Sequence, residues 1–302
     1  MTHQRGMVLI AVLGMVALLS VLLSLLLVES HTQQTRLQAQ FAQTDARYMA
    51  YSTVALAEQV LESDTAAADG TTSAWADYRV SRTFAVDEGT ISMRLDDALS
   101  LPNINRFTSD SGPAVTTYAQ ALQRYLQARG VDPSLADVAR DWVDADSNTS
   151  GYGGAESGYY VSEDPPYRTP NTDMVTPDEL NLMRGMTRQN RMAFVSATAI
   201  VPEGHIAVNI NTLDPAWMRA LLPEATTLTN ALGKRISRPY LALGDFAADA
   251  GLSELTKAVE LGVRSTYFTL QAETTAGTAQ IRADVLLKRG EGGVTVRRFI
   301  WR

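Results

Sequence analysis

The stretch THQRGMVLIAVLGMVALLSVLLSLLLVES, Thr2 to Ser30, opens the chain and decides its architecture. It contains 22 consecutive residues without a charge, from Met7 to Val28. A bilayer core of roughly 30 Å is crossed by about 20 helical residues. Residues 7–28 are therefore predicted to form a transmembrane helix.

The flanks of this stretch indicate an anchor that stays in the membrane. A cleavable secretory signal has an apolar region of roughly 7 to 15 residues followed by a site of small residues. Here the apolar run is longer and ends in Glu29 and a polar segment. Arg5 lies on one side and Glu29 on the other, so the positive-inside tendency places residues 1–6 in the cytoplasm and exports the rest.

The overall composition excludes several classes of protein. The chain has 302 residues, a formal net charge of -7 and no basic stripe, which argues against a duplex nucleic-acid partner. Cys is absent, so disulfides, thiolate metal sites and a Cys nucleophile are excluded. His205 has no convincing Ser and Asp partners for a catalytic triad.

The segment after the apolar run predicts a continued helix packed on a sheet. Residues 31–63 contain no Pro or Gly and keep apolar residues at roughly helical spacing. Strand-like segments rich in β-branched and aromatic residues then occur near both ends of the body. They are Tyr78 to Val86, Thr90 to Leu95, Tyr267 to Glu273, Gln280 to Leu287 and Val294 to Trp301.

The middle of the chain is predicted to be helical. Asp132-Pro133, Thr176-Pro177 and Asp214-Pro215 each place a capping residue before a Pro at the first helical position. Thr176 with Glu179 also fits a capping box. Helices between two sets of strands indicate an α+β fold in which the strands join into one antiparallel sheet and a helical domain is inserted.

An acidic segment carries the densest chemistry. Ten carboxylates against two arginines lie between Asp137 and Glu179. Such a cluster is solvated, binds a hard cation such as calcium, or supplies paired carboxylates for hydrolysis. Asp144, Asp146 and Asn148 have the one, three, five spacing of a calcium loop. The segment is not an EF-hand, because the sixth and twelfth positions are Thr149 and Ala155.

The junction between Gly6 and Met7 resembles the class III leader of type IV pilins and type II secretion pseudopilins. That resemblance implies cleavage after Gly6 by a prepilin peptidase and N-methylation of Met7. The family usually carries Glu at the fifth mature position, which is Ala11 here. In the pseudopilins, the usual member without this Glu is the large minor pseudopilin K at the tip of the fibre.

The body resembles the same minor pseudopilin K family. The resemblance rests on two blocks, DWVDADSNTSGYGGAESGYYVSEDPPYRTPNTDM (Asp141 to Met174) and AVNINTLDPAWMRALLP (Ala207 to Pro223), together with Asn103-Ile-Asn105, Glu179-Leu180 and Arg184-Gly185. It implies a pilin-like domain from residues 29–106 and 263–302, an inserted α-domain over 107–262, a leader over 1–6 and calcium held by acidic loops. The candidate ligands are Asp144, Asp146, Asn148, Glu156, Asn171 and Asp173.

The resemblance also implies a function without catalysis. The chain would be a single-pass inner-membrane protein with a cytoplasmic N-terminus and a periplasmic body. It would bind minor pseudopilins I and J and other pseudopilus subunits, and cap or initiate the pseudopilus that exports folded proteins. Two alternatives remain: a membrane-anchored calcium-dependent periplasmic hydrolase, and a minor pilin of a type IV pilus.

Overall fold

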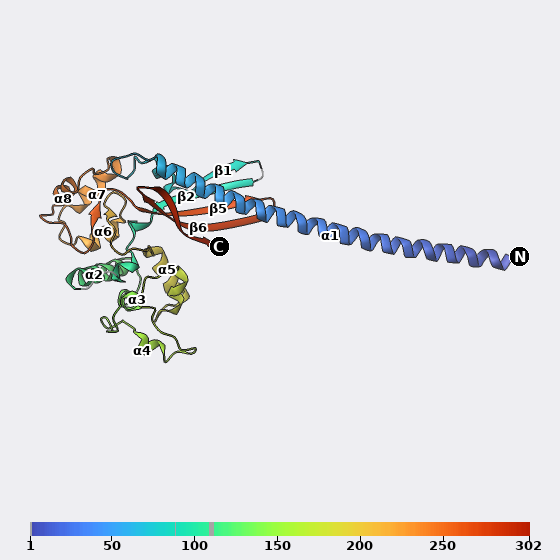
Figure 1. Cartoon of the computed structure of the whole chain (residues 1–302), viewed down its shortest axis with the longest axis horizontal. Coiled ribbons are helices and arrows are strands. Elements are labelled where there is room, and N and C mark those ends of the chain that lie inside the picture. Colours follow the sequence, from blue (N-terminus) through green and yellow to red (C-terminus); the bar gives the residue numbers. More distant parts are fainter. Residues whose placement is uncertain (1, 88, 109–111) are drawn as a thin grey trace.

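A single long helix dominates the shape of the molecule. The computed structural model describes residues 2–87, 89–108 and 112–302, with side chains from Ala11 onward. Helix α1 (Thr2–Ser63) is continuous, which confirms that the apolar run extends into an amphipathic segment. Its N-terminal half projects away from the body and its C-terminal half lies along the body (Figure 1). Gly6 and Met7 precede the described side chains, so their processing stays a prediction.

The five predicted strands form one antiparallel sheet in the order β1-β2-β5-β6-β7. This confirms the α+β class and the joining of the two strand sets. The strands are β1 (Arg82–Val86), β2 (Gly89–Asp97), β5 (Tyr267–Ala276), β6 (Ala279–Gly290) and β7 (Gly293–Trp301). The first strand was predicted to begin too early, because the 3₁₀ helix η1 (Ala74–Arg79) includes Tyr78. Val86 pairs with Gly89 across the turn that joins β1 to β2, in which Glu88 lies outside the described residues.

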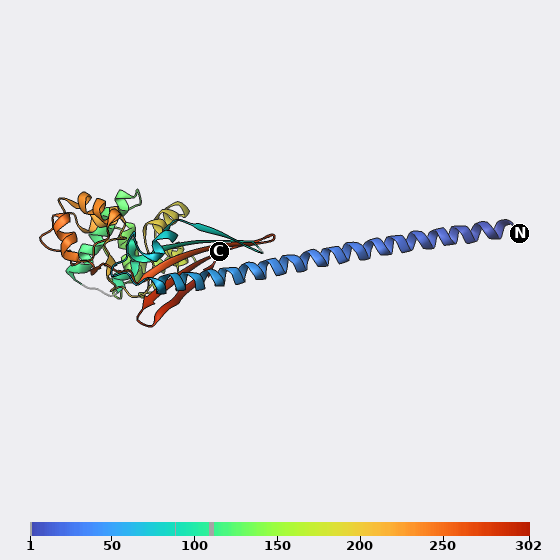
Figure 2. The ribbon, with the colours of Figure 1, turned by 90° about the horizontal axis from the view of Figure 1, so that it is seen from above.

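The C-terminal half of α1 packs on one face of this sheet, mainly against β5 and β6 (Figure 2). Small residues at Ala46, Ala50 and Ala57 are buried at this contact and let the helix approach closely. Farther along, Leu61 and Trp75 are fully buried in the same apolar cluster. Burial of this face fixes α1 on the sheet, because each fully buried Leu or Phe side chain contributes about 1.5 to 3 kcal/mol.

The segment between β2 and β5 builds a second apolar cluster from short helices. The α-helices are α2 (Pro113–Ala128), α3 (Leu135–Val143), α4 (Ser157–Tyr160), α5 (Arg188–Ala197), α6 (Pro215–Leu221), α7 (Leu228–Ser237) and α8 (Leu243–Ala250). The 3₁₀ helices are η2 (Ala98–Ser100), η3 (Ile104–Thr108) and η4 (Pro177–Leu182). A short parallel pair, β3 (Val208–Asn209) with β4 (Leu261–Gly262), was not predicted. The exact domain boundaries stay predictions.

The three predicted helix starts have different outcomes. Asp214 caps α6 as expected, since its Oδ1 accepts from the backbone N–H groups of Ala216 and Trp217. Glu179 accepts from the backbone N–H of Thr176 at 3.0 Å, although the helix that follows is 3₁₀. The start at Asp132 was wrong: α3 begins at Leu135, and Asp132 accepts from the N–H of Ser134 in the preceding turn.

A buried polar network ties the inserted segment to the sheet. Asp69 is fully buried, forms an ion pair with Arg289 of β6 and accepts from the backbone N–H of Ser265 at 2.7 Å. The hydroxyl of Ser265 donates at 2.6 Å to Asp97 of β2, which also accepts from Thr212 of the inserted segment. Burial raises the pKa of Asp97. Elements far apart in sequence are thereby locked in one orientation.

Candidate metal centre

The acidic loop begins where α3 ends and folds back on that helix. The helix is held in the core by Trp142 and Val143, which are both buried. Asp144 follows as the residue that ends the helix. Asp141, one turn earlier, is also buried, and its Oδ1 accepts from the backbone N–H of Ser150 at 2.9 Å. Asp141 therefore acts as a clamp that returns the loop toward its own helix.

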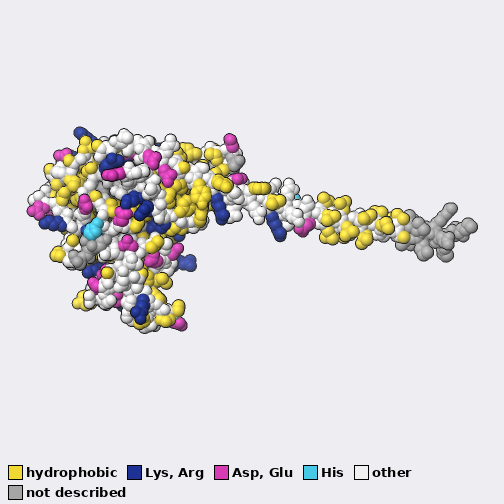
Figure 3. Space-filling model, in the orientation of Figure 1, with side chains coloured by type: hydrophobic (Ala, Val, Ile, Leu, Met, Phe, Trp, Pro, Cys, Tyr) yellow, Lys and Arg dark blue, Asp and Glu magenta, His cyan; other side chains and the backbone are white. Residues whose placement is uncertain are grey.

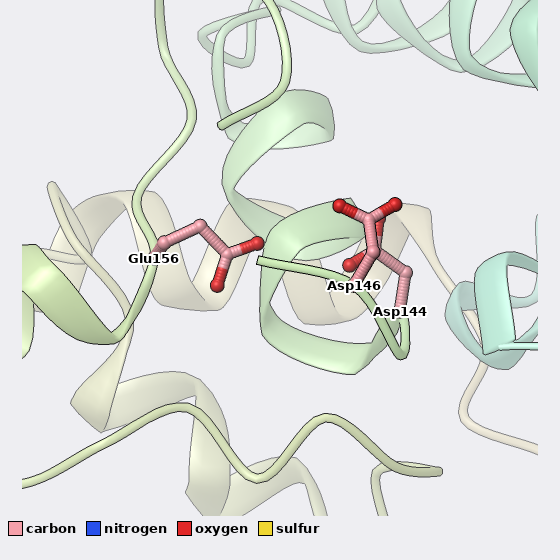
Figure 4. A group of neighbouring side chains, drawn as sticks. All are labelled: Asp144, Asp146 and Glu156. Atoms are coloured by element: carbon pink, nitrogen blue, oxygen red, sulfur yellow. The ribbon is translucent and has the colours of Figure 1, made fainter. Parts of the chain in front are cut away.

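Three carboxylates converge inside this loop (Figure 4). One oxygen each from Asp144, Asp146 and Glu156 lie within 4.8 Å of one another. Asp144 and Glu156 are buried, whereas Asp146 is exposed. Oxygens that share a calcium ion at about 2.3 to 2.6 Å lie at most about 5 Å apart, so this spacing fits a single bound cation.

Several oxygens in this loop lack hydrogen-bond partners. Oδ1 of Asp144, both carboxylate oxygens of Glu156 and Oδ1 of Asn171 are buried without one. Asn171 donates through Nδ2 to the carbonyl of Asp146 at 2.8 Å, which holds its amide against the loop. Burying an acceptor without a partner costs about 1 to 3 kcal/mol, and more for a charge. Four such oxygens near one another therefore favour a bound cation.

The electrostatics of the loop also favour the binding of a cation. Burial, followed by the charges of Asp146, Asp141 and Glu156, raises the pKa of Asp144 to about 7. Arg140 opposes this shift only weakly, with Nε at 3.5 Å from Oδ2 of Asp144. Burial likewise raises the pKa of Glu156. A divalent cation would supply the charge that keeps these carboxyls ionised.

The structure brings together some of the predicted ligands and separates others. Asp144, Asp146 and Glu156 form the cluster, and Asn171 joins the same loop through its hydrogen bond to Asp146. The backbone N–H of Asn148 donates to Oδ1 of Asp146 at 2.7 Å, while its side chain is exposed. Asp173 accepts from the hydroxyl of Thr108 at 2.5 Å and falls outside the acidic cluster found among the described residues. Their role as ligands stays a prediction.

Sequence reasoning missed why the loop contains Gly154. A Cβ at this position would lie 2.2 Å from Oδ2 of Asp141 and 2.3 Å from the carbonyl of Ser150. The carboxylate that clamps the loop thus occupies the space of a side chain. The related residues in the sequence are Asp141, near the end of a helix, and Gly154, 13 residues later. Their relation can be seen only when the loop is folded back onto the helix.

Replacing this glycine is expected to destabilise the inserted segment. Gly154→Ala should lower the free energy of unfolding by about 1 to 3 kcal/mol, because the new methyl group must displace Asp141 or the backbone. Gly158→Ala is the matched control, since a Cβ there would meet nothing within 4 Å. Denaturant unfolding of both variants, without added metal, measures the difference. Equal stability of the two would contradict the clamp.

The raised pKa of Asp144 predicts a pH dependence of the metal-free chain. In the folded chain its pKa of about 7 lies well above the ordinary value of 3.8 for Asp. The contribution of this carboxyl to stability is therefore fully present below pH 4 and is lost as the pH rises through 7. In chelator, the free energy of unfolding should therefore decline between pH 5 and pH 8. Asp144→Asn, which cannot ionise, should show a smaller decline, and an unchanged pH profile in the variant would contradict the assignment.

The chain was compared with known proteins. Residues 101–203 match the family model described as "Type II secretion system (T2SS), protein K". The type II secretion system protein K of Klebsiella pneumoniae is 29% identical, over 99% of this chain and 98% of the relative. The protein of the same name from Aeromonas hydrophila is 27% identical, over 98% and 97%.

A solved structure has the same fold. A chain in the crystal structure of the GspK-GspI-GspJ complex from enterotoxigenic Escherichia coli superposes with a TM-score of 0.71 at 21% identity, covering 91% of this chain and 99% of that chain. The structural similarity thus covers most of the chain. Together with the sequence matches, it shows that this chain resembles type II secretion system protein K over nearly its whole length.

Proposed function

We propose that this chain is a minor pseudopilin of a type II secretion system that forms a tip complex with minor pseudopilins I and J. This complex initiates and caps the pseudopilus, which exports folded proteins. The observation that carries the proposal is the shared architecture, because a chain of the GspK-GspI-GspJ complex superposes on 91% of this chain.

The long helix supports a single-pass membrane anchor. Within the described residues, the span Ala11–Ser63 contains an 18-residue window of mean hydropathy 2.8, none of it buried. On the face seen in Figure 3, hydrophobic side chains cover the stretch of this projecting helix next to the grey residues. We place it in the inner membrane with the N-terminus in the cytoplasm and the body in the periplasm, because Arg5 and Glu29 flank the apolar run.

The N-terminal junction supports assembly at the tip. In this proposal a prepilin peptidase cuts after Gly6 and Met7 becomes the methylated first residue. Ala11 then stands where other pseudopilins carry a Glu whose charge needs a partner in the membrane, because an unpaired charge is costly there. A subunit without that carboxylate needs no subunit above it.

Calcium is the cation we assign to the acidic loop. Asp144, Asp146, Glu156 and Asn171 would hold it through hard oxygen atoms, with Asn148 and Asp173 as weaker candidates. Because Asp144 and Glu156 bury oxygens that lack partners, the ion would satisfy them and neutralise the loop. Its role is structural.

The arrangement of these carboxylates argues against hydrolysis. Acid and base carboxyls that act on a glycosidic bond flank the substrate at about 5 to 9.5 Å. Here one oxygen from each of three acids lies within 4.8 Å of the others, and such a convergence of three acids suits a single cation better than an acid and base pair. Among the described residues, no specific contact favours the hydrolase alternative or the type IV pilus alternative.

A secretion assay tests the proposed function. A strain that lacks this chain should retain its type II exoproteins in the periplasm, and expression of the full chain should restore their release. Pilus-dependent motility, measured in the same strains, is the control for the type IV alternative. Normal exoprotein release without the chain, or a defect confined to motility, would contradict the proposal.

A further inference from the structure

The sheet face opposite to α1 forms the floor of a large cleft. Successive side chains of a strand point to opposite faces of its sheet. Leu95, Leu270 and Val285 belong to the apolar cluster under α1, so the residues next to them point to the other face. The inserted segment lies over that face and leaves a cavity of about 750 Å³ between itself and the sheet. Cavities of this volume are typical of ligand sites.

Strand register places polar side chains across this floor. Arg94 of β2, Gln271 of β5 and Asp284 of β6 form one cross-strand row. The adjacent row begins with Asp96 of β2 and ends with Arg298 of β7. Charged side chains therefore reach from the β2 side of the floor to the β7 side.

The lining of the cleft is rich in arginine, although the chain as a whole has a net charge of -7. Among the described residues, the arginines that line it are Arg79, Arg94, Arg235, Arg298 and Arg302. The acids that line it are Asp96, Asp97, Asp214 and Asp284. We call this site the arginine cleft.

The aspartates of the arginine cleft already have partners. Asp96 pairs with Arg94 at 2.7 Å, and Asp284 pairs with Arg302 at 2.8 Å. The other two aspartates accept hydrogen bonds from hydroxyl groups or from backbone N–H groups. The remaining arginines therefore keep a positive charge that these acids do not neutralise directly.

Two arginines are held in the lining without a carboxylate. Arg235 is 8% exposed and donates to the carbonyls of Ile210 and Leu213 at 2.6 and 2.7 Å. Arg298 also donates to two backbone carbonyls. Within residues 2–87, 89–108 and 112–302, neither guanidinium forms an ion pair. Burial lowers the pKa of both side chains, to about 10 for Arg235. Carbonyls fix the position of a guanidinium but do not cancel its charge.

These charges lie at the two ends of the arginine cleft. Arg79 lies 3.9 Å from Asp96 of β2, and its charge acts on Arg235. Arg298 belongs to β7, three strands away from β2 in the sheet order. Three strand spacings of about 4.8 Å give roughly 14 Å, which an extended peptide covers with about four residues. Gln271 lies between the two ends and is exposed, so its amide offers a donor and an acceptor to a peptide backbone.

We propose that the arginine cleft binds an extended acidic segment of a partner protein, with one carboxylate near Arg79 and Arg235 and a second near Arg298. Carboxylates suit this site because a guanidinium donates to them through two parallel N–H groups. A small anion would reach only one end of the cleft. An apolar or basic segment would leave the arginines without a countercharge. The inference does not depend on the proposed function.

A peptide-binding experiment on the full chain in detergent tests the chemistry of the ligand. The probe is a fluorescent, end-blocked peptide of about nine residues, all Ser except for two Glu placed four residues apart. Fluorescence anisotropy should show that it binds, and that binding weakens as salt is raised. The same peptide with Gln in place of both Glu should bind at least about 10-fold more weakly. Equal affinities of the two peptides, or no binding of the acidic one, would overturn the proposal.

A change at Gln271 tests the location without removing an arginine. Gln271→Glu alters an exposed side chain very little in size but adds a negative charge to the centre of the floor. It should weaken binding of the acidic peptide about 10-fold, whereas Gln271→Lys should strengthen it. Gln127→Glu, at an exposed position of α2, changes the net charge equally and should alter the Kd less than about twofold. If the two Glu variants behave alike, the peptide does not bind in the arginine cleft.

Thiol labelling separates a peptide site from a site for any anion. The chain has no Cys, so Gln271→Cys introduces a single thiol on the floor. The acidic peptide with a bromoacetyl group between its two Glu should alkylate this thiol about 10-fold faster than the thiol of Gln127→Cys. An excess of unlabelled acidic peptide should slow the reaction, and the same concentration of inorganic phosphate should not. Equal rates at the two thiols, or equal protection by phosphate, would contradict the assignment.

Discussion

Calcium is expected to raise the unfolding temperature of the chain by about 5 to 10 °C. A ligand at 100 times its Kd adds about 2.7 kcal/mol to the folded state, and each kcal/mol shifts the midpoint of a large domain by about 2 to 4 °C. The cause is the set of buried oxygens on Asp144, Glu156 and Asn171 that have no hydrogen-bond partner. Calorimetry with calcium and then with a chelator measures the shift.

Substitution at Asp144 should have different consequences for stability with calcium and in chelator. Asp144→Ala removes a ligand and should abolish the calcium response. In chelator, however, the variant should be at least as stable as the wild type, because it also removes a carboxyl that Asp146, Asp141 and Glu156 repel. Asp178→Ala, in the same acidic segment but 64% exposed, should keep the full response. Identical melting curves of the wild type with and without calcium would end the assignment.

Removal of Arg289 is expected to cost about 3 to 5 kcal/mol of stability. This guanidinium is 11% exposed and pairs with Asp69, which is fully buried, while Asp64 lies 3.8 Å away. Arg289→Met keeps an unbranched apolar side chain but removes the guanidinium, whose Cζ lies 5.0 Å from the Phe268 ring centroid, and leaves Asp69 without its main countercharge. Breaking a buried pair from one side is costly because the remaining charge stays desolvated.

A second arginine of β6 provides the control. Arg282 pairs with Glu273 at 3.1 Å, but its side chain is 62% exposed. Exposed pairs contribute about 0 to 1 kcal/mol, so Arg282→Met should have little effect. Urea unfolding of the two variants compares buried and exposed pairs on one strand. A loss below about 1 kcal/mol for Arg289→Met would show that the network does not hold the inserted segment on the sheet.

The sequence predicted those parts of the fold that depend on local patterns. The length of α1 followed from the absence of Pro and Gly after the apolar run, and the helix ends at Ser63. The five strands followed from alternation and turn residues, and their pairing confirms the inserted arrangement. Asp214 capped its helix because its side chain needs only neighbours two and three residues away.

The parts that sequence reasoning missed depend on distant contacts. Asp69 and Arg289 are 220 residues apart, so no local pattern relates them. The short strands β3 and β4 pair through two residues each, too few to show a period. At the acidic loop, residue types and spacing identified Asp144 and Asp146 as candidates. The hydrogen bond from Ser150 to Asp141, and the position of the Asp141 carboxylate where a side chain on Gly154 would lie, are seen only in the folded chain.

One measurement tests the central claim most directly. The full chain, expressed with minor pseudopilins I and J and purified through a tag on this chain alone, should yield all three proteins in a single peak of defined mass. The complex should form in the presence of calcium. A chelator should weaken or dissociate it, because loss of calcium should destabilise the inserted domain. If neither I nor J copurifies in calcium, the account of this chain as a tip pseudopilin is wrong.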